Sequence, residues 1–496
     1  MRLAELFPAE LFPRAAIPDV LAAREIKGIS ADSRRVTADM VFFAVPGTKT
    51  DGLIFVPQAV ERGAMAIVAE RDPGGSIGPA AFVKAIDVRR ALALASARLY
   101  PRQPKTIVAV TGTSGKTSVA DFVRQIWAAL GVKAASLGTL GVLGDLGAAA
   151  PPGPVAGSLT TPDPVSLHKI LDGLARGGVT HLALEASSHG ILQRRLDGVR
   201  LTAAAFTNLS RDHLDYHATL DEYLSAKLQL FERLLAPGQS AIVDAGSDAA
   251  AKVIAACERR GLRALSTGYK GASLRLLEAK AEDFSTRIKI AHEGEIFSVL
   301  LPLAGAFQVS NALVAAALCI AAGSPAGAVL PALEKLAGAP GRLELVGRSQ
   351  SAPIFVDYAH KPDALDKALK ALRPFVRGKL IVVFGCGGDR DAGKRPIMGA
   401  IAARLADHVI VTDDNPRSED PASIRESVLR GAAGSDNVEE TGDRAFAIAR
   451  AIAMLGPDDG LLIAGKGHET GQIAGGTTLP FSDSGCVRAI LNEASA

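Results

Sequence analysis

One short stretch of the sequence has the composition of a phosphate-binding loop: Gly112, Thr113, Ser114, Gly115, Lys116, Thr117 and Ser118. The backbone N–H groups of such a turn, followed by a helix N-terminus, bind phosphate anions. Lys116 is expected to reach the β- and γ-phosphates of a nucleotide, and the Thr117 hydroxyl to bind Mg²⁺. Val110 occupies the place of the first glycine of the general pattern. The chain also has no Asn-Lys-x-Asp base reader, which argues against a GTPase.

The elements that must position this loop are an apolar strand before it, "TIVAV", and a helix after it. Similar β-rich runs alternate with helical patterns further on: "HLALEA", "AAAFTN", "SAIVD", "KLIVVFG", "HVIVTDD" and "GLLIAG". This alternation predicts α/β domains with largely parallel sheets. Several runs lead directly into polar loops, namely "EASSHG", "NLSRDHLDYH", "GCGGDRDAGKR", "TDDNPR" and "GKGHE". Ligands bind at the carboxyl ends of such strands, so these loops are candidate site segments.

The length of 496 residues indicates about three domains. Gly/Pro-containing joints lie near Leu99–Lys105 and Gly338–Gly347, and they predict domains at 1–103, 104–338 and 339–496. A Gly/Ala/Pro-rich segment at Gly144–Gly157 is predicted to be a flexible loop.

Composition excludes several classes of protein. The net charge is only +3 and no run of five like charges occurs, so nucleic acid is not an expected partner. The longest apolar run, Ala312–Ala322, is shorter than the ~20 residues of a membrane helix, and the N-terminus does not resemble a signal peptide. The scattered cysteines predict neither a disulfide framework nor a zinc site: Cys257, Cys319, Cys386 and Cys486. We therefore expect a cytoplasmic protein without a membrane partner.

Motifs along nearly the whole chain resemble those of the Mur ligases, the ATP-dependent amino-acid ligases of peptidoglycan precursor synthesis. They are "ADSRRVTADMVFFAVPGTKTDG", "GTSGKTS", "SLTTPDP", "EASSHG", "FTNLSRDHLDYH", "SAKLQLF", "LAGAFQVSN", "PGRLE", "VDYAHKPDAL", "GCGGDRDAGKRPIMG", "DNPR" and "GKGHE", in the family's order. The resemblance is strongest to the ligases that add the third residue of the stem peptide. It implies an N-terminal UDP-binding α/β domain, a central P-loop ATPase-like domain with a parallel sheet, and a C-terminal Rossmann-like domain.

The activity implied is addition of meso-diaminopimelate to the D-Glu γ-carboxylate of UDP-MurNAc-L-Ala-D-Glu, with ATP and Mg²⁺, through an acyl phosphate. A monomer acting on these small molecules is expected. The resemblance assigns catalytic roles to Lys116, Glu185, His213 and Lys227, and metal binding to Thr117, Glu185, His213 and Lys227 as a carbamate. From the residues alone, Glu185 could cap a strand and Lys227 would be a solvated helix lysine. His189 and His217 are weaker candidates, because loop histidines are common.

Substrate contacts are implied in the same way. The UDP-substrate would contact Ala31, Ser33, Thr48, Lys49, Thr50, Thr160, Thr161, Ser187, Gln193 and Arg195. "TKT" and "SLTT" depart from the family's usual residues at two of these places. ATP would contact the phosphate loop, Asn311 and Arg342, with Gln308 where Asn is more usual. The loop bearing Asp357, His360 and Lys361 lies near the nucleotide in the family.

The amino-acid site would comprise Arg390, Asp414, Asn415, Pro416, Arg417, Gly465 and Glu469. Meso-diaminopimelate carries a distal carboxylate where L-lysine ends in an ammonium group. A guanidinium from "DNPR" would pair with that carboxylate and repel the lysine cation. The alternative is an Asx-Pro turn with a solvated arginine. "FSDSGCVR" lacks the charged pair that usually follows its aspartate.

Other functions stay open at this point. An L-lysine-adding ligase is the nearest alternative, whereas dipeptide-adding ligases and folylpolyglutamate synthases are disfavoured by "DSR" and "DNPR". A P-loop ATPase or switch would release phosphate without an acceptor. A binding protein would have no use for Lys116, Thr117, Glu185 and His213 together.

Overall fold

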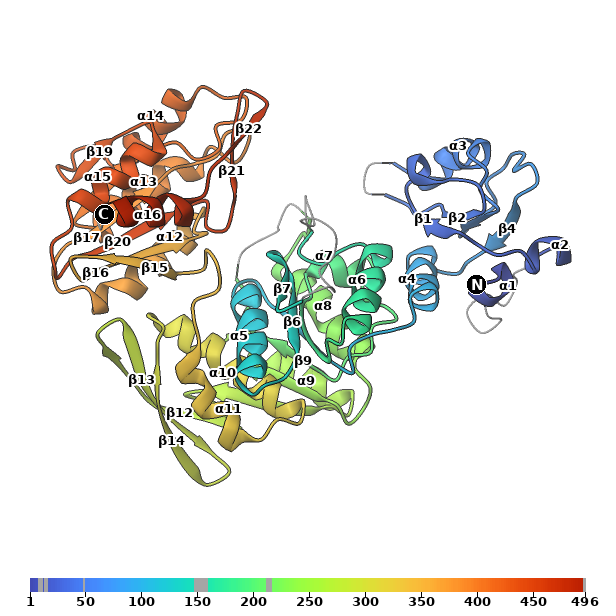
Figure 1. Ribbon diagram of the computed structural model, residues 1–496, viewed down its shortest axis with the longest axis horizontal. Helices are drawn as coiled ribbons and strands as arrows, with labels where there is room; N and C mark the ends of the chain where they lie inside the picture. Colours follow the sequence, from blue (N-terminus) through green and yellow to red (C-terminus); the bar gives the residue numbers. More distant parts are fainter. Residues whose placement is uncertain (8–11, 13–16, 48–49, 147–158, 211–215, 494–496) are drawn as a thin grey trace. The chain divides into compact units, whose positions relative to one another are not determined.

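The computed structural model describes residues 1–7, 12, 17–47, 50–146, 159–210 and 216–493. They form two compact units, whose elements are labelled in Figure 1. The first comprises Met1–Leu265 with Ala321–Gly323, and the second comprises Ser266–Ile320 with Ser324–Ala496. Most of the loop predicted at Gly144–Gly157 lies outside the described residues. Within the described ranges, no helix is long and apolar enough to cross a membrane.

The first unit begins with a four-stranded parallel sheet of order β1-β2-β3-β4. Its strands are β1 (Gly28–Ser30), β2 (Met40–Phe43), β3 (Ala66–Ala69) and β4 (Ala81–Lys84). The helices of this part are α1 (Leu3–Leu6), α2 (Asp19–Ala22), α3 (Val56–Glu61) and α4 (Val88–Leu99). Apolar side chains on both faces of the sheet pack into two clusters, as expected for a parallel sheet covered on both sides.

A larger sheet carries the phosphate loop, and six of its strands lie in the order β10-β9-β5-β8-β6-β7. These are β5 (Thr106–Thr111), β6 (Ala134–Gly138), β7 (Gly141–Gly144), β8 (His181–Glu185), β9 (Ala203–Phe206) and β10 (Ser240–Asp244), and β11 (Arg263–Gly268) follows in the chain. Neighbouring strands from β10 to β6 are parallel, whereas β7 runs antiparallel to β6. The helices are α5 (Lys116–Ala129), α6 (Pro164–Arg176), α7 (Ser188–Leu192), α8 (Leu220–Gln229) and α9 (Ala250–Arg259).

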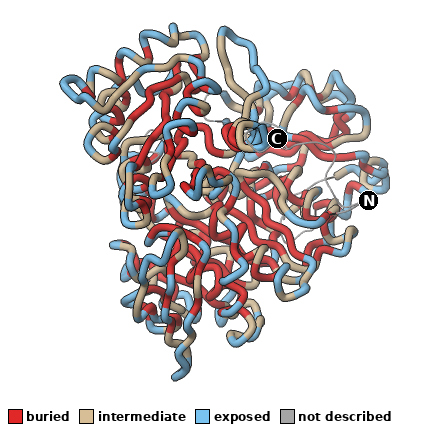
Figure 2. Tube along the Cα trace, turned by 60° about the vertical axis from the view of Figure 1, so that its left-hand side comes forward, coloured by how far each residue is buried: buried red, intermediate tan, exposed pale blue. Residues whose placement is uncertain are grey.

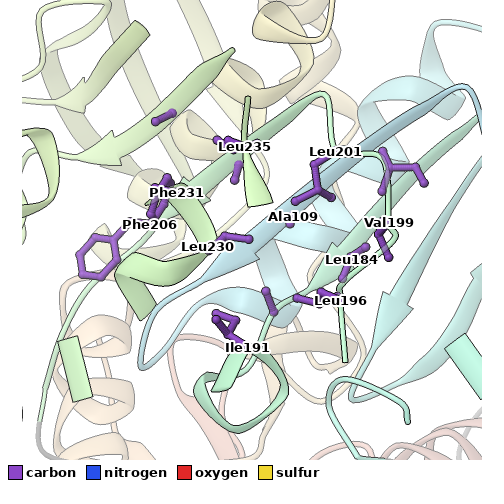
Figure 3. Packing of buried hydrophobic residues seen from close by; sticks show 14 of the residues in the cluster. Ala109, Leu184, Ile191, Leu196, Val199, Leu201, Phe206, Leu230, Phe231 and Leu235 are labelled. Carbon is purple, nitrogen blue, oxygen red and sulfur yellow. The ribbon is translucent and has the colours of Figure 1, made fainter. Parts of the chain in front are cut away.

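One hydrophobic cluster holds this sheet to its helices. Figure 3 shows Ala109, Leu184 and Phe206 from three adjacent strands packed with side chains of the α7 and α8 regions. Leu230 and Phe231 of the π-helical turn after α8 are fully buried in it. Strands β5, β8 and β9 are buried along nearly all of their length, and buried residues are red in Figure 2. The packing therefore fixes the strand ends from which the site loops emerge.

The second unit contains an antiparallel meander and a six-stranded sheet. The meander strands are β12 (Leu274–Glu282), β13 (Ser285–His292) and β14 (Glu295–Leu301), and helices α10 (Ala306–Ala321) and α11 (Ala326–Ala332) follow. The sheet has the order β15-β16-β20-β17-β18-β19 and is parallel except for β15. Its strands are β15 (Glu344–Ser349), β16 (Ala352–Asp357), β17 (Leu380–Phe384), β18 (His408–Val411), β19 (Val438–Glu440) and β20 (Gly460–Ala464).

Helices cover both faces of this sheet, and two separate apolar clusters lie between helices and strands. The helices are α12 (Pro362–Leu372), α13 (Lys394–Leu405), α14 (Pro421–Gly431), α15 (Arg444–Ala453) and α16 (Asp483–Glu493), and a hairpin is formed by β21 (Gly471–Ala474) and β22 (Thr477–Pro480). All seven apolar runs predicted to be strands are strands. The predicted α/β class with parallel sheets is confirmed.

Candidate active site

The phosphate loop joins the end of β5 to the start of α5. Gly112 has φ +149° and Gly115 has φ +86°, in the region where glycine is favoured. A Cβ atom on Gly112 would lie 1.9 Å from Thr207 Oγ1, so no larger residue fits without displacing a neighbour. Lys116 and Thr117 form the first helical positions, as the sequence predicted.

Residues after β9, which pairs with β5, hold the loop in place. Asn208 Oδ1 accepts a hydrogen bond from the Ser114 backbone N–H at 3.0 Å, and Asn208 Nδ2 donates one to Ser114 O at 3.2 Å. The Thr207 hydroxyl donates to Ser114 O at 2.6 Å. Sequence reasoning assigned no role to Thr207 or Asn208. Their place at the carboxyl end of a β-rich run was the available signal.

Two lysines meet at one carbonyl oxygen of the loop. Lys116 Nζ donates to Gly112 O and Thr113 O, both at 3.0 Å, and Lys227 Nζ donates to Gly112 O at 2.8 Å. Lys227 is 1% exposed, and its Nζ lies 4.0 Å from the centre of the Tyr223 ring. The interpretation of Lys227 as a solvated helix lysine is therefore wrong. The α8 helix instead presents this side chain to the phosphate loop.

Thr117 and Glu185 form an oxygen-rich corner beside the loop. The Thr117 hydroxyl donates to Glu185 Oε2 at 3.1 Å, and the Thr139 N–H donates to Glu185 Oε1 at 2.8 Å. Glu185 is 2% exposed, so it is not a surface cap. Carboxylate and hydroxyl oxygens next to bound phosphates suit Mg²⁺, which prefers oxygen ligands. These two side chains therefore fit the predicted ion.

Gly138 gives the Glu185 carboxylate its space. A Cβ atom on Gly138 would lie 2.1 Å from Glu185 Oε1 and 2.5 Å from its Cδ. We expect Gly138→Ala to displace the carboxylate and lower activity about 10–100-fold, the usual cost of disturbing the groups around a metal ligand. The apparent affinity for Mg²⁺, measured by titration of activity, should fall as well. Gly173→Ala is the matched control, since its Cβ would meet nothing within 4 Å; unchanged activity of Gly138→Ala would contradict this role of the glycine.

The predicted histidines have different outcomes. His213 lies outside the described residues. His217 Nε2 lies 3.1 Å from the Ser188 hydroxyl, and the His189 ring lies 3.9 Å from that of Tyr216. Over the ranges that the structure covers, no group of three or more His, Cys, Asp or Glu side chains could hold a metal ion. His189 and His217 thus belong to an aromatic cluster beside Tyr223 and Tyr216.

Side chains predicted to hold the muramoyl dipeptide are brought together. Thr161 Oγ1 lies 3.2 Å from Ser187 Oγ, and Thr139 Oγ1 lies 3.1 Å from Thr160 Oγ1. Arg195 donates through Nη1 to Thr161 O and through Nη2 to Gln193 Oε1, both at 2.7 Å. Burial lowers the pKa of Arg195 from its usual value. Thr160, Thr161, Ser187, Gln193 and Arg195 therefore form one polar patch near Glu185.

The predicted uridine contacts are only partly described. Ser33 is 4% exposed and donates its hydroxyl to Gln58 Oε1 at 2.6 Å, whereas Ala31 and Thr50 are exposed. Thr48 and Lys49 lie outside the described residues. Gln58, on α3, is a partner that sequence reasoning missed.

In the second unit, the predicted ATP contacts lie together. Gln308 donates to Arg342 O at 3.0 Å and accepts from Asn311 Nδ2 at 3.2 Å. The Arg342 guanidinium lies 4.6 Å from the centre of the Tyr358 ring, a residue not predicted to be in the site. Among the residues described, Arg342 Nε is buried without a hydrogen-bond partner. An unpaired buried donor of this kind is consistent with binding an anionic ligand.

Two side chains at the end of β16 and in the loop after it have pKa values far from their usual ones. Burial raises the pKa of Asp357 to about 6, and Asp357 Oδ2 accepts the Leu343 N–H at 2.6 Å. Burial lowers the pKa of His360 to about 4, while its Nδ1 contacts Tyr358 O at 2.8 Å. Lys361 precedes α12 as its N-cap residue. Perturbed groups of this kind cluster at functional sites.

"DNPR" and "GKGHE" lie side by side. Asn415 donates through Nδ2 to Glu469 Oε2 at 2.8 Å, and Lys466 Nζ donates to Asn415 Oδ1 at 3.0 Å. Asp414 is 8% exposed, and burial raises the pKa of its carboxyl. A Cβ atom on Gly465 would lie 2.5 Å from Asp414 Oδ2, which explains this glycine. Lys466 was not among the predicted site residues, although it stands inside a predicted motif.

Arg417 is not the freely solvated arginine of a simple turn. Its Nη1 donates to Gly388 O at 2.7 Å, its side chain is partly buried, and its backbone has φ +56°. A positive φ is uncommon for a residue with a side chain and marks a constrained position. Pro416 is buried beside it, whereas Arg390 is exposed.

Two residues that were not predicted to belong to the site support these loops. Arg444 and Asp483 form a fully buried ion pair with N–O distances of 2.7 and 2.8 Å. Arg444 also donates to Ala464 O at 3.0 Å and to Asp413 O at 3.3 Å, the carbonyls just before Gly465 and Asp414. Asp483 belongs to "FSDSGCVR", whose role sequence reasoning left unexplained.

Comparison with known proteins matches three Mur ligase domain families. The "Mur ligase family, catalytic domain" matches residues 25–98, the "Mur ligase middle domain" 110–319 and the "Mur ligase, glutamate ligase domain" 341–467.

Two curated relatives carry the name UDP-N-acetylmuramoyl-L-alanyl-D-glutamate–2,6-diaminopimelate ligase. The Bradyrhizobium diazoefficiens protein is 56% identical over 96% of this chain and 97% of its own length. The Chelativorans protein is 53% identical over the full length of both chains. A solved structure of a ligase of the same name has a TM-score of 0.73 and 32% identity, covering 100% of this chain and 99% of that chain. The chain therefore belongs to the Mur ligase family.

Proposed function

We propose that this chain is the ATP-dependent ligase that adds meso-diaminopimelate to the D-Glu γ-carboxylate of UDP-MurNAc-L-Ala-D-Glu in peptidoglycan precursor synthesis. The observation that carries the proposal is the joining of "DNPR" to "GKGHE" through Asn415 and Glu469, in a chain that also has a phosphate loop. The names of the relatives support the same reaction.

The proposed reaction has two steps, a phosphoryl transfer and an amide-bond formation. An oxygen of the γ-carboxylate attacks the γ-phosphorus of ATP, and the bond from that phosphorus to ADP breaks to leave an acyl phosphate. The amine nitrogen of meso-diaminopimelate then attacks the acyl carbon, inorganic phosphate leaves, and the nitrogen loses a proton. Phosphoryl transfer requires mainly positioning and positive charge, which the loop N–H groups and Lys116 supply.

Thr117 and Glu185 would hold Mg²⁺, together with His213 and Lys227 if the latter is carbamylated. The ion supplies charge neutralisation for the phosphate oxygens. Arg195, beside Thr161 and Gln193, is suited to bind a carboxylate or pyrophosphate of the acceptor substrate with its forked guanidinium. Asn311 and Arg342 are the proposed adenine and phosphate contacts.

Further expectations belong to this proposal. The three predicted domain ranges, 1–103, 104–338 and 339–496, each contain one of the matched segments. A monomer is proposed, and because the substrates are nucleotide-linked precursors and ATP, the reaction is expected in the cytoplasm.

The direct test is an amino-acid panel with UDP-MurNAc-L-Ala-D-Glu, ATP and Mg²⁺, with the product identified by mass. Addition of meso-diaminopimelate supports the proposal, whereas preferential addition of L-lysine assigns the alternative ligase. ADP release without acceptor or amine would identify an ATPase instead.

Arg417→Ala should raise the apparent KM for meso-diaminopimelate at least about tenfold, because a charge-assisted hydrogen-bonded pair is lost. Discrimination against L-lysine should shrink, since the repelling cation is gone. The KM values for ATP and the UDP-substrate should hardly change.

Steady-state kinetics with each substrate varied will measure these effects. Arg417→Lys keeps the charge without the fork and should recover part of the affinity. Arg430→Ala, an exposed arginine of α14, is the control and should behave as wild type. A normal KM for meso-diaminopimelate in Arg417→Ala would contradict this role and leave "DNPR" interpreted as a simple turn.

A further inference from the structure

A fully buried lysine lies against the proposed amino-acid site. Lys466 is 0% exposed, and its Nζ lies 3.0 Å from Asn415 Oδ1 and 3.4 Å from Glu469 Oε2. Lysine is almost never fully buried unless its charge is paired. The position of this cation therefore requires an explanation.

Lys466 helps to set the orientation of the Asn415 amide. Asn415 Oδ1 accepts hydrogen bonds from Lys466 Nζ and, at 2.9 Å, from the Ile473 backbone N–H. With two donors facing the oxygen, the amide nitrogen must face Glu469 Oε2, 2.8 Å away. Lys466 thus contacts both proposed ligand-binding side chains.

The charges around Lys466 show which carboxylate it neutralises. Asp483 is paired with Arg444 at 2.7 Å, and burial raises the pKa of Asp414 although the Arg444 and Lys466 charges oppose that rise. Glu469 is the partly exposed carboxylate of the group, with 32% of its side chain accessible, and its Oε2 forms an ion pair with Lys466 Nζ at 3.4 Å. The Glu469 charge is therefore offset by Lys466 from the buried side.

This offset has a consequence for amino-acid selection. A partly exposed carboxylate without a counter-charge attracts the bare side-chain ammonium of L-lysine. The distal end of meso-diaminopimelate carries both an ammonium and a carboxylate, and the carboxylate is repelled by an uncompensated Glu469. Because specificity is a difference between two affinities, neutralising Glu469 favours the zwitterionic end over the cationic one.

We propose that Lys466 is a specificity-determining positioning residue: by neutralising Glu469 and orienting Asn415, it selects meso-diaminopimelate against L-lysine. The inference rests on the proposed ligase function and deepens it.

The test compares kcat/KM for meso-diaminopimelate and L-lysine in the full-length enzyme, with UDP-MurNAc-L-Ala-D-Glu, ATP and Mg²⁺. Lys466→Gln keeps a donor for Asn415 but removes the charge, and Lys466→Met removes both. Each variant should lower the ratio of kcat/KM for meso-diaminopimelate to kcat/KM for L-lysine about tenfold, because a close charge–charge interaction is lost in a partly buried site. Lys367→Met, an exposed helix lysine paired with Asp363, is the control and should leave the ratio unchanged.

A second background isolates the proposed cause. In Glu469→Gln, the further change Lys466→Gln should shift the ratio less than it does alone, because the carboxylate to be neutralised is absent. An equal shift in both backgrounds would overturn the inference. A proportional loss of activity with both amino acids, at constant ratio, would also overturn it and leave Lys466 as a purely structural residue.

The two proposals fail in different ways. Failure of the wild-type enzyme to use meso-diaminopimelate contradicts the ligase assignment, whereas a wild-type preference with an unchanged ratio in the variants contradicts the inference alone. If neither Lys466 variant folds, Glu469→Gln provides the test. Its uncompensated Lys466 should raise the preference for meso-diaminopimelate over L-lysine, and an unchanged ratio would overturn the inference.

Discussion

Lys116→Ala is expected to abolish ADP formation, with kcat falling by at least about 10²–10³, the effect of removing one preorganised donor to a developing charge. Lys116 Nζ lies at the phosphate loop, on Gly112 O and Thr113 O, where it can move to the β- and γ-phosphates. A coupled assay of ADP release will measure the loss. Binding of the UDP-substrate, followed by calorimetry, should persist, because the proposed uridine contacts lie around Ser33 and not in the loop.

The control for this variant is Lys133→Ala, at an exposed lysine before β6. It should retain wild-type kinetics. Near-normal turnover of Lys116→Ala would contradict the phosphate-loop interpretation.

Lys227→Ala is expected to lose most of the activity. The family resemblance predicts that this amine bonds to the carbon of CO₂, releases a proton and becomes a carbamate that helps to hold Mg²⁺. The buried position of Nζ, 2.8 Å from Gly112 O, puts the side chain at the loop that such an anion would serve. High bicarbonate should not restore the Ala variant, which has no amine, but a small carboxylic acid added in trans should restore part of its activity.

Carbamylation and structural support predict different results for Lys227→Ala. If Lys227 only contacts Gly112 O and the Tyr223 ring, its replacement by alanine would lower the melting temperature. Added carboxylic acid would then have no effect on activity. Labelled bicarbonate and carbon NMR of the wild-type enzyme will detect the carbamate directly. Lys252→Ala, at an exposed lysine paired with Asp221, is the control. A fully active Lys227→Ala enzyme would contradict both roles.

Local patterns predicted much of the fold. The run "TIVAV" and its counterparts became strands because short apolar segments bounded by turn and polar residues suit buried parallel sheets. The phosphate loop could be predicted because the turn depends on residues that are adjacent in the sequence. Gly112 and Gly115 supply the positive φ angles that it needs. The resemblance of whole motifs then identified the family.

The sequence by itself therefore determined the strands, the phosphate loop and the motifs of the site. The tertiary structure alone decided which polar side chains meet across large sequence separations. Lys227 contacts a carbonyl 115 positions away, and Lys466 contacts Asn415 across 51 positions. A helical pattern indicates which face of a helix is apolar, but not which loop packs against it. From its pattern alone Lys227 was therefore interpreted as solvated, whereas it is buried. These contacts depend on the order in which parallel strands assemble, and strand order is a property of the folded sheet and not of any local run of residues.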